Sequence, residues 1–119
     1  MRVFFDTNVL VSAFLARGLC ADLLRLVLTE HTLVTSEVVL AELHDVLSRK
    51  GRLPAQQIEA IEMFLREHPV APIPVQTLEL GIVDADLFVT GDQGVLACSK
   101  PPLPLVNPRG CWERLRGAG

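Results

Sequence analysis

Residues 3–10 of the chain read Val3-Phe4-Phe5-Asp6-Thr7-Asn8-Val9-Leu10, and the fold class can be predicted largely from them. The first three side chains form a short apolar run, which predicts a buried strand in the middle of a sheet. The polar triplet Asp6-Thr7-Asn8 ends that run abruptly and predicts a turn. From Val9 to Ala16 apolar residues recur at helical spacing, so a helix follows. A buried strand, a polar turn and a helix in this order are typical of an α/β domain.

The rest of the chain alternates between predicted strands and helices. Beyond the first strand and helix, we predict helices over 20–28, 37–49 with Ser36 as N-cap, 54–68, 77–83 and 108–115, and strands over 32–35, 87–90 and 103–106. Three prolines between Pro69 and Pro74 exclude a helix there and favour extended chain. The alternation predicts one α/β domain over residues 1–119, with a central parallel sheet of about four to five short strands and helices on both faces.

Composition narrows the class of protein further. Of 119 residues, 50% are hydrophobic and 21% charged, so the chain can bury a core and is not disordered. A net charge of −3 excludes nucleic-acid binding through bulk positive charge. The three cysteines form no C-x-x-C pair, which argues against a disulfide scaffold or a zinc site and fits a reducing cytoplasm. We find neither a signal peptide nor a stretch that approaches the ~20 apolar residues of a membrane span.

Two acidic residues follow predicted strands directly. Asp6 comes after Val3-Phe4-Phe5, and Asp92 comes after the run that ends in Val89-Thr90-Gly91. Ligands of open parallel sheets bind beyond the carboxyl ends of the strands, which is where both acids are expected. Aspartate is also an ordinary turn residue, so either one alone has a plain structural explanation. The two together point more strongly to a site.

Glu42 is a third candidate because of its place on a predicted helix. The inward face of that helix is defined by Val39, Leu43, Val46 and Leu47, and Glu42 falls on the same stripe. A partly buried carboxylate is costly unless it is protonated, paired with a cation or bound to a metal. In the plainer interpretation, Glu42 flanks the apolar face and reaches water or pairs with an arginine.

Three acids that face one pocket without a basic partner suit Mg²⁺ or Mn²⁺. These hard cations take carboxylate oxygens as ligands, retain several waters and bind phosphates. A metal of this kind activates water and stabilises the leaving oxygen of a phosphodiester. The predicted reaction class is therefore hydrolysis of a nucleic-acid backbone.

Three blocks of the chain, taken together, carry a family resemblance. They are Phe5-Asp6-Thr7-Asn8-Val9-Leu10-Val11-Ser12-Ala13, Ser36-Glu37-Val38-Val39-Leu40-Ala41-Glu42-Leu43 and Ala85-Asp86-Leu87-Phe88-Val89-Thr90-Gly91-Asp92. In their order and spacing they resemble a PIN domain, and Val106-Asn107-Pro108-Arg109 is similar to the last strand and helix of that family. Within PIN domains, the length and the Val-Thr-Gly-Asp block resemble VapC-like toxins of prokaryotic toxin–antitoxin pairs. This resemblance implies a metal-dependent ribonuclease, commonly a homodimer, that a cognate antitoxin holds inactive.

The resemblance also implies roles for single residues. Asp6 and Glu42 match the family's first two metal-site acids, and Asp92 matches the acid after the threonine of the late strand. Asn8 and Thr90 match polar residues that brace the pocket. We therefore expect Asp6, Glu42 and Asp92 to be the catalytic and metal-binding residues.

One family acid is missing. It usually opens the helix before the late strand, where this chain has Pro74 and Val75, and no acid occurs between Glu67 and Glu79. Glu79 lies about one helical turn from the expected place and could reach the metal if the helix were shifted. Asp84 and Asp86 precede the late strand and are expected at the opposite end of the sheet. The metal site is thus predicted to be incomplete.

Two other functions fit the same residues. A degenerate PIN fold could bind RNA or a protein partner without cleaving RNA. This hypothesis follows from Pro74 and Val75, which stand where the family usually has an acid. A phosphoryl-transfer domain could use Asp6 as a nucleophile. This last hypothesis lacks the second acid two residues on, because Asn8 occupies that position.

Overall fold

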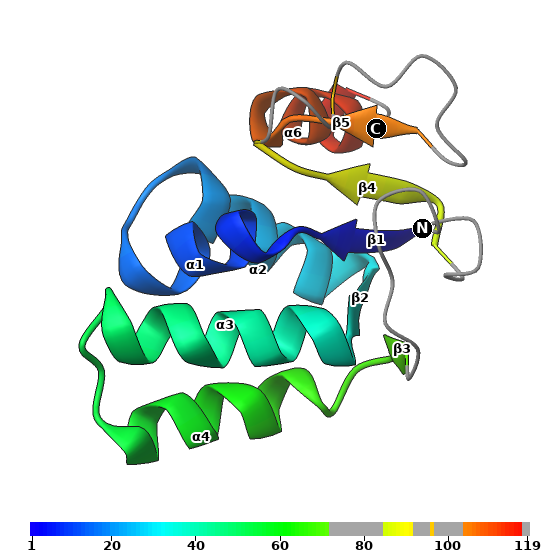
Figure 1. Cartoon of the computed structure of the whole chain (residues 1–119). Helices are drawn as coiled ribbons and strands as arrows, with labels where there is room; N and C mark the ends of the chain where they lie inside the picture. Colours follow the sequence, from blue (N-terminus) through cyan, green and yellow to red (C-terminus); the bar gives the residue numbers. More distant parts are fainter. Residues whose placement is uncertain (72–84, 92–95, 97–103, 118–119) are drawn as a thin grey trace.

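The fold is a five-stranded parallel sheet with helices packed against it (Figure 1). The structure is a computed structural model that describes residues 1–71, 85–91, 96 and 104–117. The strand order is β3-β2-β1-β4-β5, and every pairing is parallel. The strands are β1 (Arg2–Phe5), β2 (Thr32–Ser36), β3 (Val70–Ala71), β4 (Leu87–Val89) and β5 (Leu105–Val106). The predicted parallel sheet with its first strand at the centre is confirmed.

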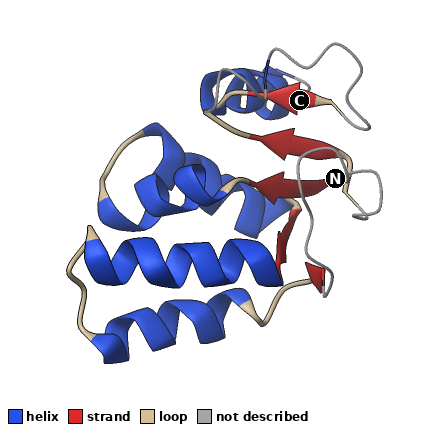
Figure 2. Ribbon diagram, in the orientation of Figure 1, coloured by secondary structure: helices blue, strands red, loops and turns tan. Residues whose placement is uncertain are grey.

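Five helices accompany the sheet in the described part of the chain (Figure 2). They are α1 (Thr7–Leu15), α2 (Leu19–Glu30), α3 (Glu37–Arg49), α4 (Ala55–Leu65) and α6 (Pro108–Gly117). Each agrees with a predicted helix, with differences at the ends. The helix predicted over 77–83 lies outside the described residues. Every described helix is too short or too polar to traverse a bilayer.

Both faces of the sheet are covered. In β1 the consecutive residues Val3, Phe4 and Phe5 are all buried, and the same holds for three successive residues of β4. Neighbouring strand residues point to opposite faces, so this pattern requires packing on both sides. At the centre, the Phe4 ring stacks on that of Phe88 with 5.2 Å between the ring centroids. The expectation of helices on both faces agrees with this burial.

The polar triplet after β1 does not form the predicted turn. Asp6 is the N-cap of α1, and Thr7 and Asn8 are already the first residues of that helix. The Oδ1 atom of Asp6 accepts a hydrogen bond from the backbone N–H of Thr7 at 2.8 Å. Aspartate is among the strongest N-caps, so the chain passes from strand to helix without a loop. The carboxylate is thereby held directly beside the end of the central strand.

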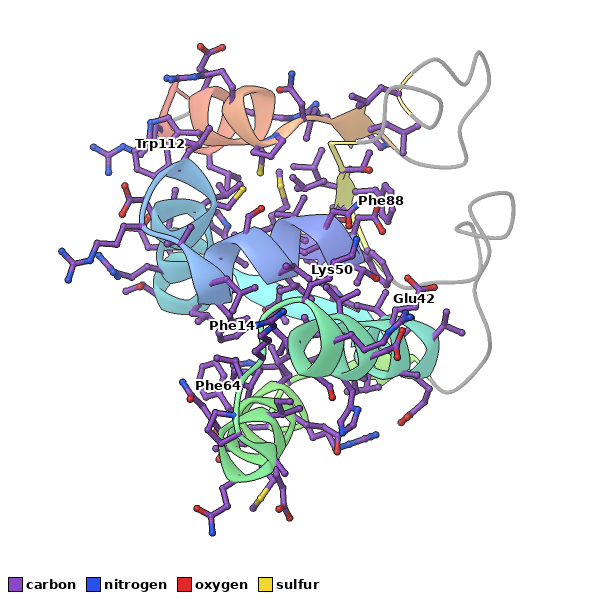
Figure 3. The ribbon with its side chains drawn as sticks, turned by 60° about the vertical axis from the view of Figure 1, so that its left-hand side comes forward. Phe14, Glu42, Lys50, Phe64, Phe88 and Trp112 are labelled. Atoms are coloured by element: carbon purple, nitrogen blue, oxygen red, sulfur yellow. The ribbon has the colours of Figure 1, made fainter. Side chains whose placement is uncertain are left out.

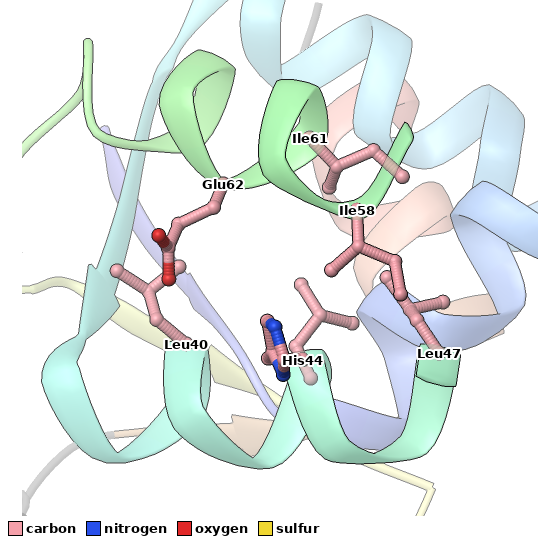
Figure 4. A pocket seen from close by; sticks show the side chains of 7 residues that line it. Leu40, His44, Leu47, Ile58, Ile61 and Glu62 are labelled. Atoms are coloured by element: carbon pink, nitrogen blue, oxygen red, sulfur yellow. The ribbon is translucent and has the colours of Figure 1, made fainter. Parts of the chain in front are cut away.

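The seam between α3 and α4 is apolar (Figure 4). It is lined by Leu40, Leu43, His44, Leu47, Ile58, Ile61 and Glu62. At one end of the pair, the guanidinium of Arg66 contacts both carboxylate oxygens of Glu37, at 2.6 and 2.9 Å. This pairing lowers the pKa of the Glu37 carboxyl. The two helices are therefore held together by an apolar interface and a bidentate ion pair.

The predicted inward face of α4 is wrong at one position. Ile58 and Leu65 are buried and Ile61 is partly buried, but Phe64 is 39% exposed. Positions 58, 61 and 65 share one side of a helix with 3.6 residues per turn, whereas position 64 lies at its edge. The Phe64 ring instead meets His68 edge-on, with 5.4 Å between the centroids, and Figure 3 shows Phe64 on α4.

The last helix starts as predicted. Asn107 Oδ1 accepts a hydrogen bond from the N–H of Gly110 at 2.6 Å, and Pro108 is the first residue of α6. Trp112 packs against the core, and Arg116 lies over its ring at 5.3 Å from the centroid. In Figure 3 Trp112 is labelled on this helix, which contacts α2. The C-terminal helix is thereby fixed beside α2.

Replacing Thr35 with valine is expected to stabilise the fold. Its Oγ1 atom is fully buried in β2 and has no hydrogen-bond partner among the described residues. Because valine has the same shape without the hydroxyl, we expect the free energy of unfolding to rise by about 1 kcal/mol, measured by urea denaturation. Thr90→Val is the matched control, since the Thr90 hydroxyl is hydrogen bonded to Asp6. Equal effects of the two substitutions would contradict this explanation.

Candidate metal and catalytic site

The carboxyl ends of the two central strands bring Asp6 and Thr90 together. The backbone N–H of Asp6 donates to the carbonyl of Val89 at 2.9 Å, which continues the pairing of β1 with β4. One residue beyond the end of β4, the fully buried Thr90 donates its hydroxyl to Asp6 Oδ2 at 2.7 Å. Both contacts lie at the sheet edge where ligands of parallel sheets bind.

The carboxylate of Asp6 is fixed through both oxygens. Oδ1 accepts from the backbone N–H of Thr7, and Oδ2 accepts from the hydroxyl of Thr90, at 2.8 and 2.7 Å. Each carboxylate oxygen has about two lone-pair positions, so each retains capacity for a further ligand. Asp6 therefore presents a charged group in one orientation without using up its oxygens.

Glu42 is connected to the site through the hydroxyl of Thr7. It lies on α3, whose N-cap Ser36 accepts a hydrogen bond from the N–H of Val39 at 3.2 Å. The Thr7 hydroxyl donates to Glu42 Oε2 at 2.8 Å. Figure 3 shows Glu42 among the side chains of this helix.

The prediction that Glu42 is partly buried is wrong. The buried face of α3 consists of Val39, Leu40, Leu43 and Leu47, and Glu42 is exposed beside it. Glu42 is offset by one residue from Leu43, which is about 100° around the helix. Glu42 flanks the apolar face and is exposed, as the plainer interpretation expects, and this exposure does not decide whether it binds a metal. Its partner, however, is the hydroxyl of Thr7 and not an arginine.

Thr7 is the residue that the sequence analysis missed. It is 5% exposed, and it contacts Asp6 through its backbone N–H and Glu42 through its hydroxyl. The sequence did contain a signal for Thr7. It directly follows Asp6 at the predicted end of the strand, so its side chain is held at the same edge of the sheet as the Asp6 carboxylate. Asn8, expected to brace the pocket, is exposed and makes no side-chain hydrogen bond within the described part of the chain.

The two carboxylates form one cluster. The backbone N–H of Thr7 contacts Asp6 Oδ1 and its hydroxyl contacts Glu42 Oε2, each at 2.8 Å, so a single residue links the two carboxylates. Among the described residues, neither carboxylate forms an ion pair with a lysine or arginine. A pair of carboxylates without a compensating cation is a favourable site for a divalent metal.

The donor set fits a hard cation. Magnesium is commonly held by one or two carboxylates, with waters and substrate phosphates completing its shell. Asp6 and Glu42 supply two such groups, although the residues that the structure describes contain no cluster of three His, Cys, Asp or Glu side chains. Asp92, Glu79, Pro74 and Val75 all lie outside the described residues. The third predicted ligand is thus an expectation from the sequence.

Asp86 lies at the opposite end of the sheet, as predicted. Its Oδ2 accepts from the backbone N–H of Arg2 at 2.8 Å, and its own N–H donates to the Arg2 carbonyl at 2.7 Å. These contacts join the first residue of β1 to the residue before β4. Asp86 therefore cannot replace the missing acid, while Asp84 lies outside the described residues.

The described cysteines take no part in the site. Cys111 is fully buried in the core, and burial raises the pKa of its thiol to about 11. Burial also raises the pKa of Cys20. Both thiols remain protonated near neutral pH and behave as small apolar side chains. Cys98 lies outside the described residues.

A known protein family matches most of the chain. Residues 3–82 match the PIN domain family. The chain belongs to the PIN domain family. The match includes both carboxylates of the cluster, Asp6 and Glu42, and ends before Thr90 and Asp92. No curated protein matches this PIN domain.

A solved structure shares the fold. The PIN domain resembles a chain in the crystal structure of VapBC2 from Rickettsia felis bound to a DNA fragment from their promoter. The TM-score is 0.59 at 20% sequence identity, and the match covers 90% of this chain and 98% of the other. The similarity thus extends over almost the whole domain.

Proposed function

We propose that this PIN domain is a divalent-metal-dependent ribonuclease and the toxin-like member of a toxin–antitoxin pair. The observation that carries the proposal is the hydrogen-bonded cluster of Thr90, Asp6, Thr7 and Glu42 at the carboxyl edge of the sheet. It gathers two carboxylates without a basic partner in the described part of the chain. Family membership and the resemblance to VapBC2 support the same assignment.

The residues of the cluster have distinct roles in this proposal. Asp6 is the central metal ligand, because its two oxygens are fixed while lone pairs stay available. Glu42 is a ligand or orients the attacking water, and Asp92 is expected as a further ligand. A bound Mg²⁺ or Mn²⁺ supplies a Lewis acid that activates water and offsets charge on the phosphate. Thr90 keeps the Asp6 carboxylate aligned.

The partners follow from the same assignment. RNA is the substrate, since the PIN resemblance implies a ribonuclease. The matched structure contains VapBC2, and we extend its toxin–antitoxin pairing to a cognate antitoxin that restrains this chain. A homodimer is the expected assembly. Because the net charge is −3, local contacts rather than bulk charge must hold the RNA.

Cleavage of a panel of single-stranded and structured RNAs tests the proposal. We expect fragments to accumulate in Mn²⁺ or Mg²⁺ and to disappear when EDTA is added, because the reaction requires the metal. Gel analysis of end-labelled RNA measures both conditions. Glu59→Gln, a change of an exposed acid on α4, is the surface-charge control for the Asp6 variants assayed on the same panel. Cleavage that persists in EDTA would contradict a metal-dependent mechanism.

A second candidate function is binding without cleavage. It is favoured by Pro74 and Val75, which stand where the family usually has an acid. A chain of this kind still folds and holds RNA or a protein partner, but lacks the full ligand set for catalysis. RNA binding without fragments, in the presence of Mn²⁺, supports this function over the first.

A further inference from the structure

Thr7 occupies a special place in the cluster, because one residue contacts both carboxylates. Its backbone N–H is 2.8 Å from Asp6 Oδ1, and its hydroxyl oxygen is 2.8 Å from Glu42 Oε2. The two contacts differ in what they depend on. Any residue other than proline at this position can supply the N–H, whereas only a hydroxyl side chain of this length supplies the second donor.

The Glu42 carboxylate needs a hydrogen bond to fix its orientation, whereas that of Asp6 is already fixed. The carboxylate of Asp6 is short and is held through both oxygens. Glu42 is exposed on α3, and fixing a free glutamate side chain costs up to about 2 kcal/mol of rotamer entropy. Its one hydrogen-bond donor among the described residues is the Thr7 hydroxyl. Without that donor, Glu42 is free to rotate into solvent.

Thr7 is well suited to be that restraint. It is 5% exposed and lies in the first turn of α1, so both its position and its surroundings are fixed by the fold. Its branched Cβ limits the rotation of the hydroxyl to a few directions. A hydrogen bond from a shielded donor is stronger than one that water competes for. The bond engages Oε2 of Glu42, so Oε1, which makes no hydrogen bond within the described part of the chain, is available to a ligand.

We propose that Thr7 is a positioning residue of the metal site, whose hydroxyl orients Glu42 toward the cation that Asp6 binds. The inference rests on the proposed function and adds a residue to it. The hydroxyl acts through Glu42 and does not contact the metal or the RNA. Asp6 does not depend on the hydroxyl, because the Thr7 backbone N–H and Thr90 hold it.

The test is calorimetric titration of Mn²⁺ into the full chain and its variants. We expect Thr7→Val to weaken Mn²⁺ affinity by about 10-fold or more, the usual effect of losing a group that orients a ligand. Thr7→Ser, which keeps the hydroxyl, is expected to restore most of that affinity. Thr35→Val removes a buried hydroxyl that has no partner among the described residues, and its Mn²⁺ affinity is expected to equal that of the wild type.

A double-mutant cycle with Glu42→Gln separates positioning from a purely structural role. If Thr7 acts through Glu42, then Thr7→Val causes no further loss of Mn²⁺ affinity once Glu42 has been replaced. An equal loss in both backgrounds overturns the proposal, as does wild-type affinity in Thr7→Val. Both of those results leave the proposed function standing. A wild-type chain that binds no Mn²⁺ overturns the positioning role and the proposed function together.

Discussion

Asp6→Asn is expected to lower RNA cleavage by at least about 100-fold while the fold keeps its stability. Asparagine caps a helix as well as aspartate does, so the start of α1 survives the substitution. With the amide oxygen accepting from the Thr7 N–H, the amide nitrogen replaces Oδ2 and donates to the Thr90 hydroxyl, which reverses the direction of the wild-type bond. Only the negative charge and the second carboxylate oxygen are lost. Initial rates on end-labelled RNA, with urea denaturation in parallel, measure the two effects.

Asp6→Ala, compared with Asp6→Asn, separates the two roles of this residue. Alanine removes the cap together with the charge, so we expect the same loss of cleavage and, in addition, about 1 kcal/mol less stability. The comparison separates the structural role of Asp6 from its role in the site. Cleavage by Asp6→Asn within a few-fold of the wild type would show that the carboxylate is not a ligand.

Pro74→Asp or Val75→Asp is expected to raise cleavage by about 10-fold, because either change supplies an acid where the family usually has one. An added carboxylate increases the negative charge and the number of ligands around a divalent cation, and both raise metal affinity. The rate gain is measured at several Mn²⁺ concentrations, where it should be largest at the lowest ones. If neither variant changes the rate, the residues at these positions do not limit the reaction.

Glu79→Gln belongs in the same experiment. If Glu79 replaces the missing acid, its loss lowers cleavage in the wild-type background and has little effect once an aspartate stands at position 74 or 75. Glu59→Gln again controls for the change of surface charge, because Glu59 is exposed on α4.

The sheet was predictable because its strands are continuous apolar runs. Val3-Phe4-Phe5 and Leu87-Phe88-Val89 have no polar residue, and the structure buries every one of these side chains. Strands that are covered on both faces have continuous apolar runs in their sequence, whereas in helices the apolar residues recur with a period of 3.6 residues. The start of α1 was missed because Asp6 acts both as a turn former and as a helix cap, and only backbone geometry separates the two.

The site was less predictable than the sheet. The acidic residues of the site could be identified from their positions after strands and on α3. The exposure of Glu42 could not be predicted, because adjacent residues differ by about 100° around the helix and a stripe of apolar residues does not define the buried face that finely. Thr7 was missed because its contact joins residues 35 positions apart in the chain. Contacts of that kind depend on how α1 and α3 pack, which is a tertiary property.

We infer that the cluster of Asp6, Thr7 and Glu42 binds a divalent cation. Calorimetric titration of Mn²⁺ into wild-type and Asp6→Asn protein measures this binding without any knowledge of the RNA target. We expect saturable binding of about one ion per chain in the wild type and loss of that binding in the variant. Equal binding by the two proteins, or no binding by the wild type, would contradict it.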